Sequence, residues 1–184
     1  MNKNQADWIE DFCQMANKYV QSELMVTLDG SPESLAYLDY CIAQSRKKKM
    51  SKESVLLASA FVGIYFGKLV VEQTQSQWVI PSDLKSENLP FETWIQLDDV
   101  PLAICPAQIA LSAFEYKEEV PFETLFKIPQ SQFSQLEPVL ERMAPMTEES
   151  YFSLTSRYEF ILYLQQILIE LKQLNAGETP SNES

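Results

Sequence analysis

Residues 51–73 constrain the fold more than any other part of the sequence, because this segment is apolar on nearly every side. A surface helix carries one apolar stripe, whereas a helix that is apolar all round is normally buried by its neighbours. Ser51 is a suitable N-cap residue for such a helix. We therefore predict a central buried helix here. Its apolar residues are Val55, Leu56, Leu57, Ala58, Phe61, Val62, Ile64, Tyr65, Phe66, Leu69, Val70 and Val71.

Two glycines lie in the middle of this helix. Gly63 and Gly67 are four residues apart, with Ser59 one turn earlier on the same stripe. A glycine inside a helix costs about 1 kcal/mol relative to alanine. A stripe of small residues lets another element approach the helix backbone closely. We expect this stripe to pack against a second helix or a sheet rather than to line a ligand pocket.

Two further helices are predicted before the central one. The first covers residues 6–24, where large apolar side chains recur at the spacing of one helix face: Trp8, Phe12, Met15 and Tyr19. The second begins with Ser31 as N-cap and Pro32 at its first position. It ends in a run of cations, which suit a helix C-terminus.

Three short β-rich runs follow the central helix, at residues 77–81, 93–97 and 101–105. They predict a small antiparallel sheet with one face covered by helices. Trp78 and Trp94 lie on adjacent predicted strands, where a cross-strand aromatic pair can form. Packing in the core or at its rim is the favoured role, and an exposed pair would instead mark a binding surface. The run at 82–90 is interpreted as a polar loop.

The C-terminal half is predicted to be helical. One helix begins at Pro106, and the ambiguous run at 120–128 fits a single helical turn around residues 122–126. A short helix is expected to begin with Ser134 as N-cap and with Pro138 near its first turn. The last helix is long, from Thr147 to about residue 174, with Gly177 as a stop.

These elements predict an α+β fold, with five or six helices packed on a small three-stranded antiparallel sheet. The chain of 184 residues has the length of one ordinary domain, and 46% of it is hydrophobic, which is enough for one core. We expect a single globular domain at 1–175 and a disordered tail at 176–184. No secretion signal is visible, and Lys68 and Glu72 interrupt the most apolar stretch, so we expect a cytoplasmic protein without a membrane span.

The residue types present exclude much of enzyme chemistry. The chain has no histidine, which removes imidazole bases and every Ser–His or Cys–His nucleophile pair. Cys13, Cys41 and Cys105 are an odd number at wide spacing and are interpreted as buried apolar residues. The acidic pairs at 98–99 and 118–119 are interpreted as solvated turn charges, without the spacing of a calcium loop. We assign no catalytic residue, cofactor or metal ligand, and a non-enzymatic protein is favoured.

The charge distribution contains one local exception. The net charge is −12, which argues against binding to nucleic acid or to an anionic membrane surface and is compatible with a basic protein partner. A basic patch nevertheless lies at the junction of the second and third predicted helices: Arg46, Lys47, Lys48, Lys49 and Lys52, beside Ser51. It is interpreted as a solvated helix end, as a docking patch for an acidic partner, or as an anion site that uses the backbone N–H groups at Ser51.

Residues 61–114 are similar to a family of uncharacterised bacterial proteins, a domain of unknown function. The similarity lies in the helix with Gly63 and Gly67, the strand with Trp78 and Val79, and a strand that ends where Pro106 opens a helix. These features are structural. The resemblance implies a bacterial protein with this packing and implies no activity.

Three functional hypotheses remain open from the sequence. The first is a non-enzymatic protein-binding or regulatory module, in one form a toxin-immunity-type neutraliser of a basic partner. The second is a ligand-binding or enzymatic domain that uses carboxylates and an anion site near Ser51. The third is a homodimer formed through a face of the helix at residues 158–171.

Overall fold

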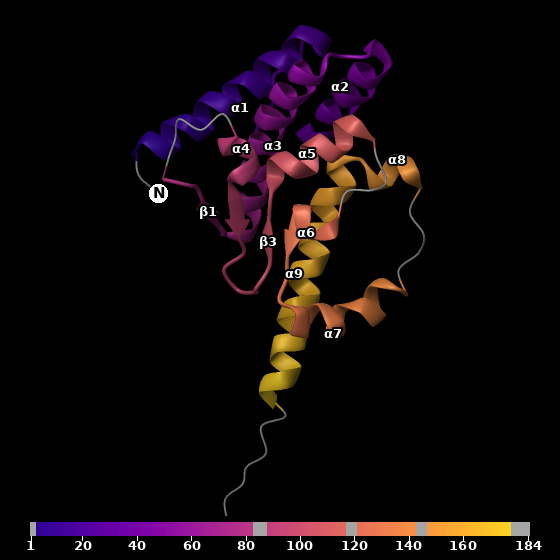
Figure 1. Ribbon diagram of the computed structural model, residues 1–184. Coiled ribbons are helices and arrows are strands. Elements are labelled where there is room, and N and C mark those ends of the chain that lie inside the picture. Colours follow the sequence, from indigo (N-terminus) through magenta and orange to yellow (C-terminus); the bar gives the residue numbers. More distant parts are fainter. Residues whose placement is uncertain (1–2, 83–87, 117–120, 143–146, 178–184) are drawn as a thin grey trace, which may run out of the picture.

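The computed structural model describes residues 3–82, 88–116, 121–142 and 147–177, and the statements below concern these residues. The expected tail at 176–184 lies almost wholly outside them. The fold is α+β, with helices packed around a four-stranded antiparallel sheet (Figure 1). The predicted fold class is therefore confirmed, whereas the predicted numbers of helices and strands are wrong.

The N-terminal half is a layer of three long helices, α1 (Lys3–Leu24), α2 (Leu35–Lys48) and α3 (Lys52–Thr74). A single 3-10 turn, η1 (Pro32–Ser34), precedes α2, so Ser31 caps this turn rather than the α-helix itself. Ser51 is the N-cap of α3, as predicted, and its hydroxyl accepts the backbone N–H of Ser54 at 3.2 Å.

Helix α3 is the central element of the core, as its composition predicts. It packs against α1, α4, α5 and α9. Among the described helices, α3 alone has the length and mean hydropathy of a membrane span, but 67% of its most apolar window is buried inside the protein. Its hydrophobicity is thus accounted for by its own neighbours. Buried apolar side chains from α1, α2, α3, α5, α9 and the sheet form one contiguous core.

The two glycines of α3 are sites of close approach, as predicted. A Cβ atom at Gly63 would overlap the backbone at Ala107, and it would lie 2.7 Å from the carbonyl oxygen of Pro106. These residues belong to the first turn of α5 (Pro106–Glu115). A Cβ atom at Gly67 would lie 2.5 Å from the Trp78 ring and 2.9 Å from Ile95. Gly63 therefore allows α5 to pack closely against α3, and Gly67 allows the sheet to do so.

The sheet has the strand order β1 (Gln77–Val79), β2 (Trp94–Gln96), β3 (Ala103–Ile104) and β4 (Phe126–Lys127), all antiparallel. The three predicted strands are present, although shorter than expected. The fourth strand was not predicted, because two residues give no alternating pattern to recognise. It follows directly after α6 (Phe122–Leu125), the single helical turn that the sequence did indicate.

The two tryptophans do not form a cross-strand pair. Trp78 lies opposite Ile95, and Trp94 lies opposite Val79. Since successive residues of a strand point to opposite faces, this offset of one residue places the two rings on opposite faces of the sheet. Trp78 packs onto α3 at Gly67, and Trp94 lies on the outer face.

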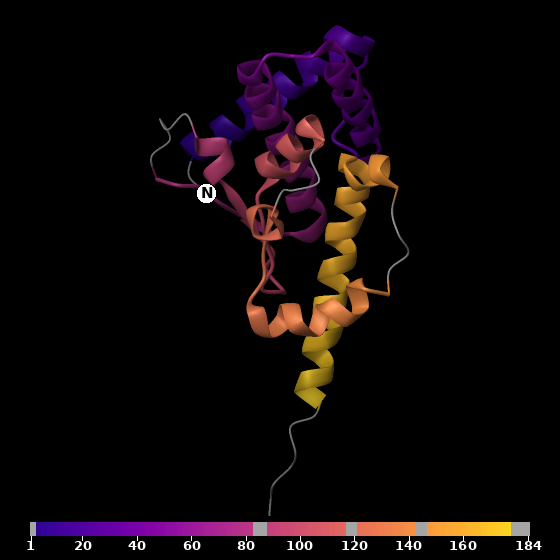
Figure 2. The ribbon, with the colours of Figure 1, turned by 45° about the vertical axis from the view of Figure 1, so that its right-hand side comes forward.

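After the central helix, the chain contains more and shorter helices than predicted. One short helix lies at the end of a segment expected to be a loop, and the expected last helix is divided into two. The expected loop at 82–90 ends in a short helix, α4 (Leu89–Glu92). Helix α7 (Gln130–Leu140) begins four residues before Ser134, so Pro138 lies inside its last turn rather than near its first. Thr147 caps only α8 (Glu148–Tyr151), and the chain turns before α9 (Leu154–Gly177) begins. Figure 2 shows α7 crossing α9 below the body of the domain.

Helix α9 uses most of its apolar face inside the protein. Tyr158, Ile161, Leu164 and Leu168 are buried, and they belong to the segment considered above as a dimer surface. The large apolar side chains of α9 that remain exposed, Tyr163 and Leu174, lie apart from that buried row.

Candidate binding groove

The basic patch predicted from the sequence is divided by the structure. Arg46 turns inward: its Nη1 donates to the carbonyl oxygen of Ala113 at 2.9 Å, and its guanidinium lies 4.3 Å from the ring centroid of Tyr116. Lys48 forms an ion pair with Glu23 at 2.6 Å. Lys47, Lys49 and Lys52 are exposed. The cations therefore do not converge on one ligand.

The backbone N–H groups near Ser51 are satisfied partly by the helix itself. The Ser51 hydroxyl accepts the N–H of Ser54, and the pKa of Glu53 is lowered by hydrogen bonds from its own backbone N–H and from Ser51. A carboxylate at this position also suits the positive end of the helix dipole. Arg46 and Lys47 instead line a hollow of about 320 Å³ with Asp39 and Glu149, away from Ser51.

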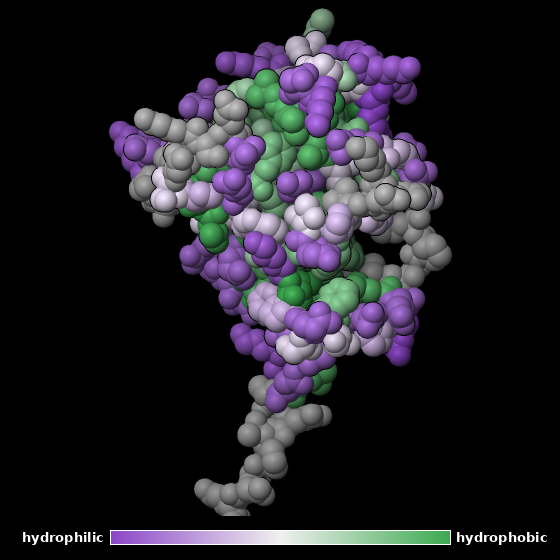
Figure 3. All heavy atoms as spheres, viewed as in Figure 1, coloured by the Kyte–Doolittle hydropathy of each residue, from purple (hydrophilic) through white to green (hydrophobic). Residues whose placement is uncertain are grey.

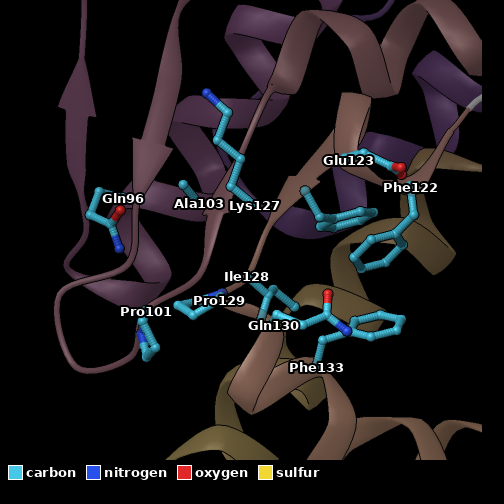
Figure 4. A pocket seen from close by; sticks show the side chains of 11 residues that line it. Gln96, Pro101, Ala103, Phe122, Glu123, Lys127, Ile128, Pro129, Gln130 and Phe133 are labelled. Atoms are coloured by element: carbon cyan, nitrogen blue, oxygen red, sulfur yellow. The ribbon is translucent and has the colours of Figure 1, made fainter.

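A larger pocket, about 700 Å³, lies along strand β4. The turn between β2 and β3 bounds it at one end, and α6 and the start of α7 bound it at the other. Figure 3 shows apolar side chains gathered in this region with polar side chains around them. The lining residues, most of them labelled in Figure 4, are Gln96, Pro101, Ala103, Phe122, Glu123, Phe126, Lys127, Ile128, Pro129, Gln130 and Phe133.

Aromatic rings form one side of this groove. Phe122 stacks on Phe126 with ring centroids 4.8 Å apart, and it contacts Phe133 at 5.5 Å. Phe126 is buried and meets the edge of Phe160 on α9 at 6.0 Å. Phe122 and Phe133 are only partly buried. The buried ring of Phe126 therefore supports the ring of Phe122, which in turn contacts Phe133.

The outer face of the sheet forms the other side. The Lys127 ammonium lies 3.6 Å from the ring centroid of Trp94. Strand β3 separates these two residues, and Ala103 is the residue opposite Lys127. Its small side chain leaves room for the lysine stem to cross the strand and reach the ring. This cation–π contact is worth roughly 0.5–1 kcal/mol at an exposed site.

Gln96 stabilises the end of the groove at the turn between β2 and β3. Its side-chain amide lies within hydrogen-bonding distance of three carbonyl oxygens, those of Leu97 at 3.2 Å, Val100 at 3.3 Å and Leu102 at 3.1 Å. The backbone of the turn adds a bond from the Leu97 N–H to the Leu102 carbonyl at 2.9 Å. The groove is thus bounded by a turn that its own hydrogen bonds hold in shape.

Within the described ranges, no cluster of His, Cys, Asp and Glu residues is arranged to hold a metal ion. The three cysteines are free and buried, as predicted, and burial raises the pKa of Cys13 to about 12 and of Cys41 and Cys105 to about 11. Such thiols are protonated at neutral pH and are poor nucleophiles.

The groove could not be predicted from the sequence for an identifiable reason. Phe122 and Phe126 lie in a run whose pattern is ambiguous, and Phe133 lies in a helix that begins four residues before the expected N-cap, Ser134. The four-residue spacing of Phe122 and Phe126 was the available signal, since it suggests a shared face. It could not show that Phe126 is buried in a two-residue strand or that Phe122 contacts Phe133 on the next helix.

The position of the site therefore rests on the geometry of this chain. No protein-family model, no curated protein and no solved structure matches it.

Proposed function

We propose that this protein is a non-enzymatic protein-binding module whose groove along β4 receives a segment of a basic partner protein. The observation that carries this proposal is the pair of partly exposed rings, Phe122 and Phe133, which contact each other while Phe122 stacks on the buried ring of Phe126. Aromatic residues seated in preformed hollows are the residues that most often dominate the free energy of protein association.

The basic character of the partner follows from charge. The chain carries a net charge of −12, and the exposed carboxylate of Glu123 lies at the aromatic side of the groove. A field of this sign accelerates the approach of a cationic protein and repels an acidic one. One specific form of this function is a cytoplasmic neutraliser of a basic partner, of the toxin-immunity type, in a bacterial cell.

The alternative of a ligand-binding or enzymatic domain with an anion site near Ser51 has less support. In the described part of the chain, Ser51 and Glu53 themselves occupy N–H groups of that helix start. Arg46 is engaged with Ala113 and Tyr116. Binding of a protein segment in the groove along β4 leaves these contacts undisturbed.

The test is an affinity capture with the full-length chain as bait in the cytoplasmic extract of its source cells. We compare the wild-type protein with Phe133→Ala at low and at high salt, and Tyr37→Ala is the matched control because Tyr37 is an exposed aromatic residue on α2. We expect a basic partner whose recovery and purified-protein affinity fall about tenfold with Phe133→Ala, since removing an aromatic anchor costs more than about 1 kcal/mol.

Two outcomes contradict the proposal. One is repeated recovery of no specific partner at low salt. The other is a partner whose affinity is the same for wild-type protein and Phe133→Ala, with both proteins shown to be equally folded by urea unfolding. Binding that does not weaken at high salt contradicts the electrostatic part, because interactions between exposed charges are screened by salt.

A further inference from the structure

A second hollow continues the groove. It has a volume of about 470 Å³ and lies at the turn between β2 and β3, beside α7 and the lower part of α9. Gln96 and Pro101 line both hollows, so the two adjoin, and together they are named the channel. We name the part with Phe122, Phe126 and Phe133 the aromatic half. The part with Asp98 and Asp99 is the acidic half.

The carboxylates of the acidic half are available to a cation. Asp98 and Asp99 are exposed, and in the described ranges neither forms an ion pair. Among the described residues, Asp98 Oδ2 accepts one hydrogen bond, from the Gln77 side chain at 3.2 Å. The nearby ammonium of Lys172 donates to the backbone carbonyl of Asp99 at 3.2 Å rather than to a carboxylate.

The cation of the aromatic half is also engaged. The ammonium of Lys127 lies on the Trp94 ring, 3.6 Å from its centroid. The ionisable side chains along the whole channel are Glu123, Asp98 and Asp99 against Lys127 and Lys172. Both lysines have partners within the fold, whereas the three carboxylates have no cation bound to them among the described residues.

The acidic half is preformed. Leu97, Val100 and Leu102 are buried beneath the turn, and the Leu102 N–H donates to the Val100 carbonyl at 2.8 Å. Because the turn is already ordered, a partner loses little free energy in ordering it on binding. Two exposed carboxylates on such a turn suit a guanidinium, which donates several hydrogen bonds in one plane.

We infer that the channel binds a short segment of the partner with two anchors, a large apolar side chain in the aromatic half and an arginine or lysine in the acidic half. This inference rests on the proposed function and specifies the chemistry that the groove recognises. An acidic or phosphorylated segment is excluded by the same carboxylates, because like charges brought together are repelled.

The experiment uses short synthetic peptides and the full-length protein. Each peptide carries one tryptophan and two adjacent arginines, separated by glycine spacers of increasing length. One control series replaces the arginines with glutamates, and another replaces the tryptophan with glycine. Affinity is measured by isothermal titration calorimetry or by fluorescence anisotropy of a labelled peptide, at low and at high salt.

Charge variants give effects of opposite sign. We expect Asp98→Asn and Asp99→Asn each to lower the affinity for the arginine peptides by about two- to fivefold at low salt, which is the range for exposed ion pairs. Lys172→Gln removes a like charge from the same half and is expected to strengthen binding severalfold. Phe133→Ala is expected to weaken binding of the tryptophan peptides, and Tyr37→Ala to leave it unchanged. A merely destabilised protein does not produce opposite signs at Asp98 and Lys172.

Failure of this inference and failure of the proposed function give different results. If the captured partner depends on Phe133 but arginine and glutamate peptides bind equally, the two-anchor inference is overturned and the proposed function stands. The same holds if no peptide binds better than its glycine control. If the partner binds wild-type protein and Phe133→Ala with equal affinity, the proposed function is wrong, and the inference that rests on it is wrong as well.

Discussion

Asp39 and Thr155, which are 116 residues apart in the chain, are joined through one carboxylate oxygen: Asp39 Oδ2 accepts the backbone N–H of Thr155 at 3.1 Å and its hydroxyl at 2.7 Å. The other oxygen accepts the N–H of Leu154 at 2.6 Å. The Asp39 side chain of α2 therefore caps the N-terminus of α9. A carboxylate there satisfies N–H groups that have no partner within the helix, and it also suits the positive end of the helix dipole.

We expect Asp39→Ala to lower the free energy of unfolding by about 2 kcal/mol, because it removes a helix cap together with its charge-assisted hydrogen bonds. Asp39→Asn retains one acceptor and should cost less. Equilibrium urea unfolding monitored by circular dichroism measures both changes. Asp7→Ala is the control, since Asp7 is exposed on α1. A loss for Asp39→Ala no larger than that for Asp7→Ala would show that α9 does not depend on this contact.

The same carboxyl group gives a pH dependence of known sign. Burial raises the pKa of Asp39, and the hydrogen bonds from Thr155 and Leu154 and the charge of Arg46 offset only part of this effect. The folded state then binds the proton more tightly than the unfolded state does. The stabilisation from Asp39 is fully present below its unfolded pKa of about 3.9 and is lost as the pH rises through the folded value.

We therefore expect the difference in unfolding free energy between wild-type protein and Asp39→Asn to shrink as the pH rises through that window. Other groups titrate in both proteins and cancel in the difference. Urea unfolding of both proteins over a pH series measures it. A difference that grows with pH would mean that the hydrogen-bond donors at Leu154 and Thr155 outweigh the cost of burial.

Gly63→Ala is expected to destabilise the protein although alanine is the better helix former. The gain in helix propensity is about 1 kcal/mol. The new methyl group would overlap the backbone at Ala107, which is not a side chain that can rotate away, so α5 would have to shift. Overpacking typically costs about 1–3 kcal/mol, and an overlap with backbone belongs at the upper end, so we expect a net loss of about 2 kcal/mol.

Thermal or urea unfolding measures the effect of Gly63→Ala. Gln73→Ala is the matched control because it lies on the exposed side of the same helix and should be close to neutral. Equal stability of Gly63→Ala and wild-type protein would contradict the close approach of α3 and α5.

The three thiols are expected to react slowly in the folded protein. Burial raises the pKa of Cys13 to about 12 and of Cys41 and Cys105 to about 11. At pH 8 a thiol with a pKa near 11 is about 0.1% thiolate, and only the thiolate reacts with disulfide reagents. We expect labelling to be at least about a hundredfold slower in native buffer than in concentrated urea, where all three should react. A thiol that reacts equally fast in both conditions would not be buried.

The elements that could be predicted are those with enough length to show a pattern. Helix α3 was recognisable because a segment that is apolar on every side can only be stable inside other elements. The Gly63 and Gly67 stripe, the start of α3 at Ser51 and the start of α5 at Pro106 follow from local backbone chemistry in the same way. Segments without such patterns were misread, and β4 and the start of α7 are the examples.

The sequence by itself determined the α+β class, the central helix and the absence of imidazole chemistry, because composition and short-range spacing decide these properties. Only the tertiary structure decided the register that separates Trp78 from Trp94 and the contact that places Asp39 at the start of α9. It also decided the channel that joins Phe133 to Asp98. These features depend on which distant segments meet, and the free energy of such contacts is set by packing across the core rather than by any local stretch of residues.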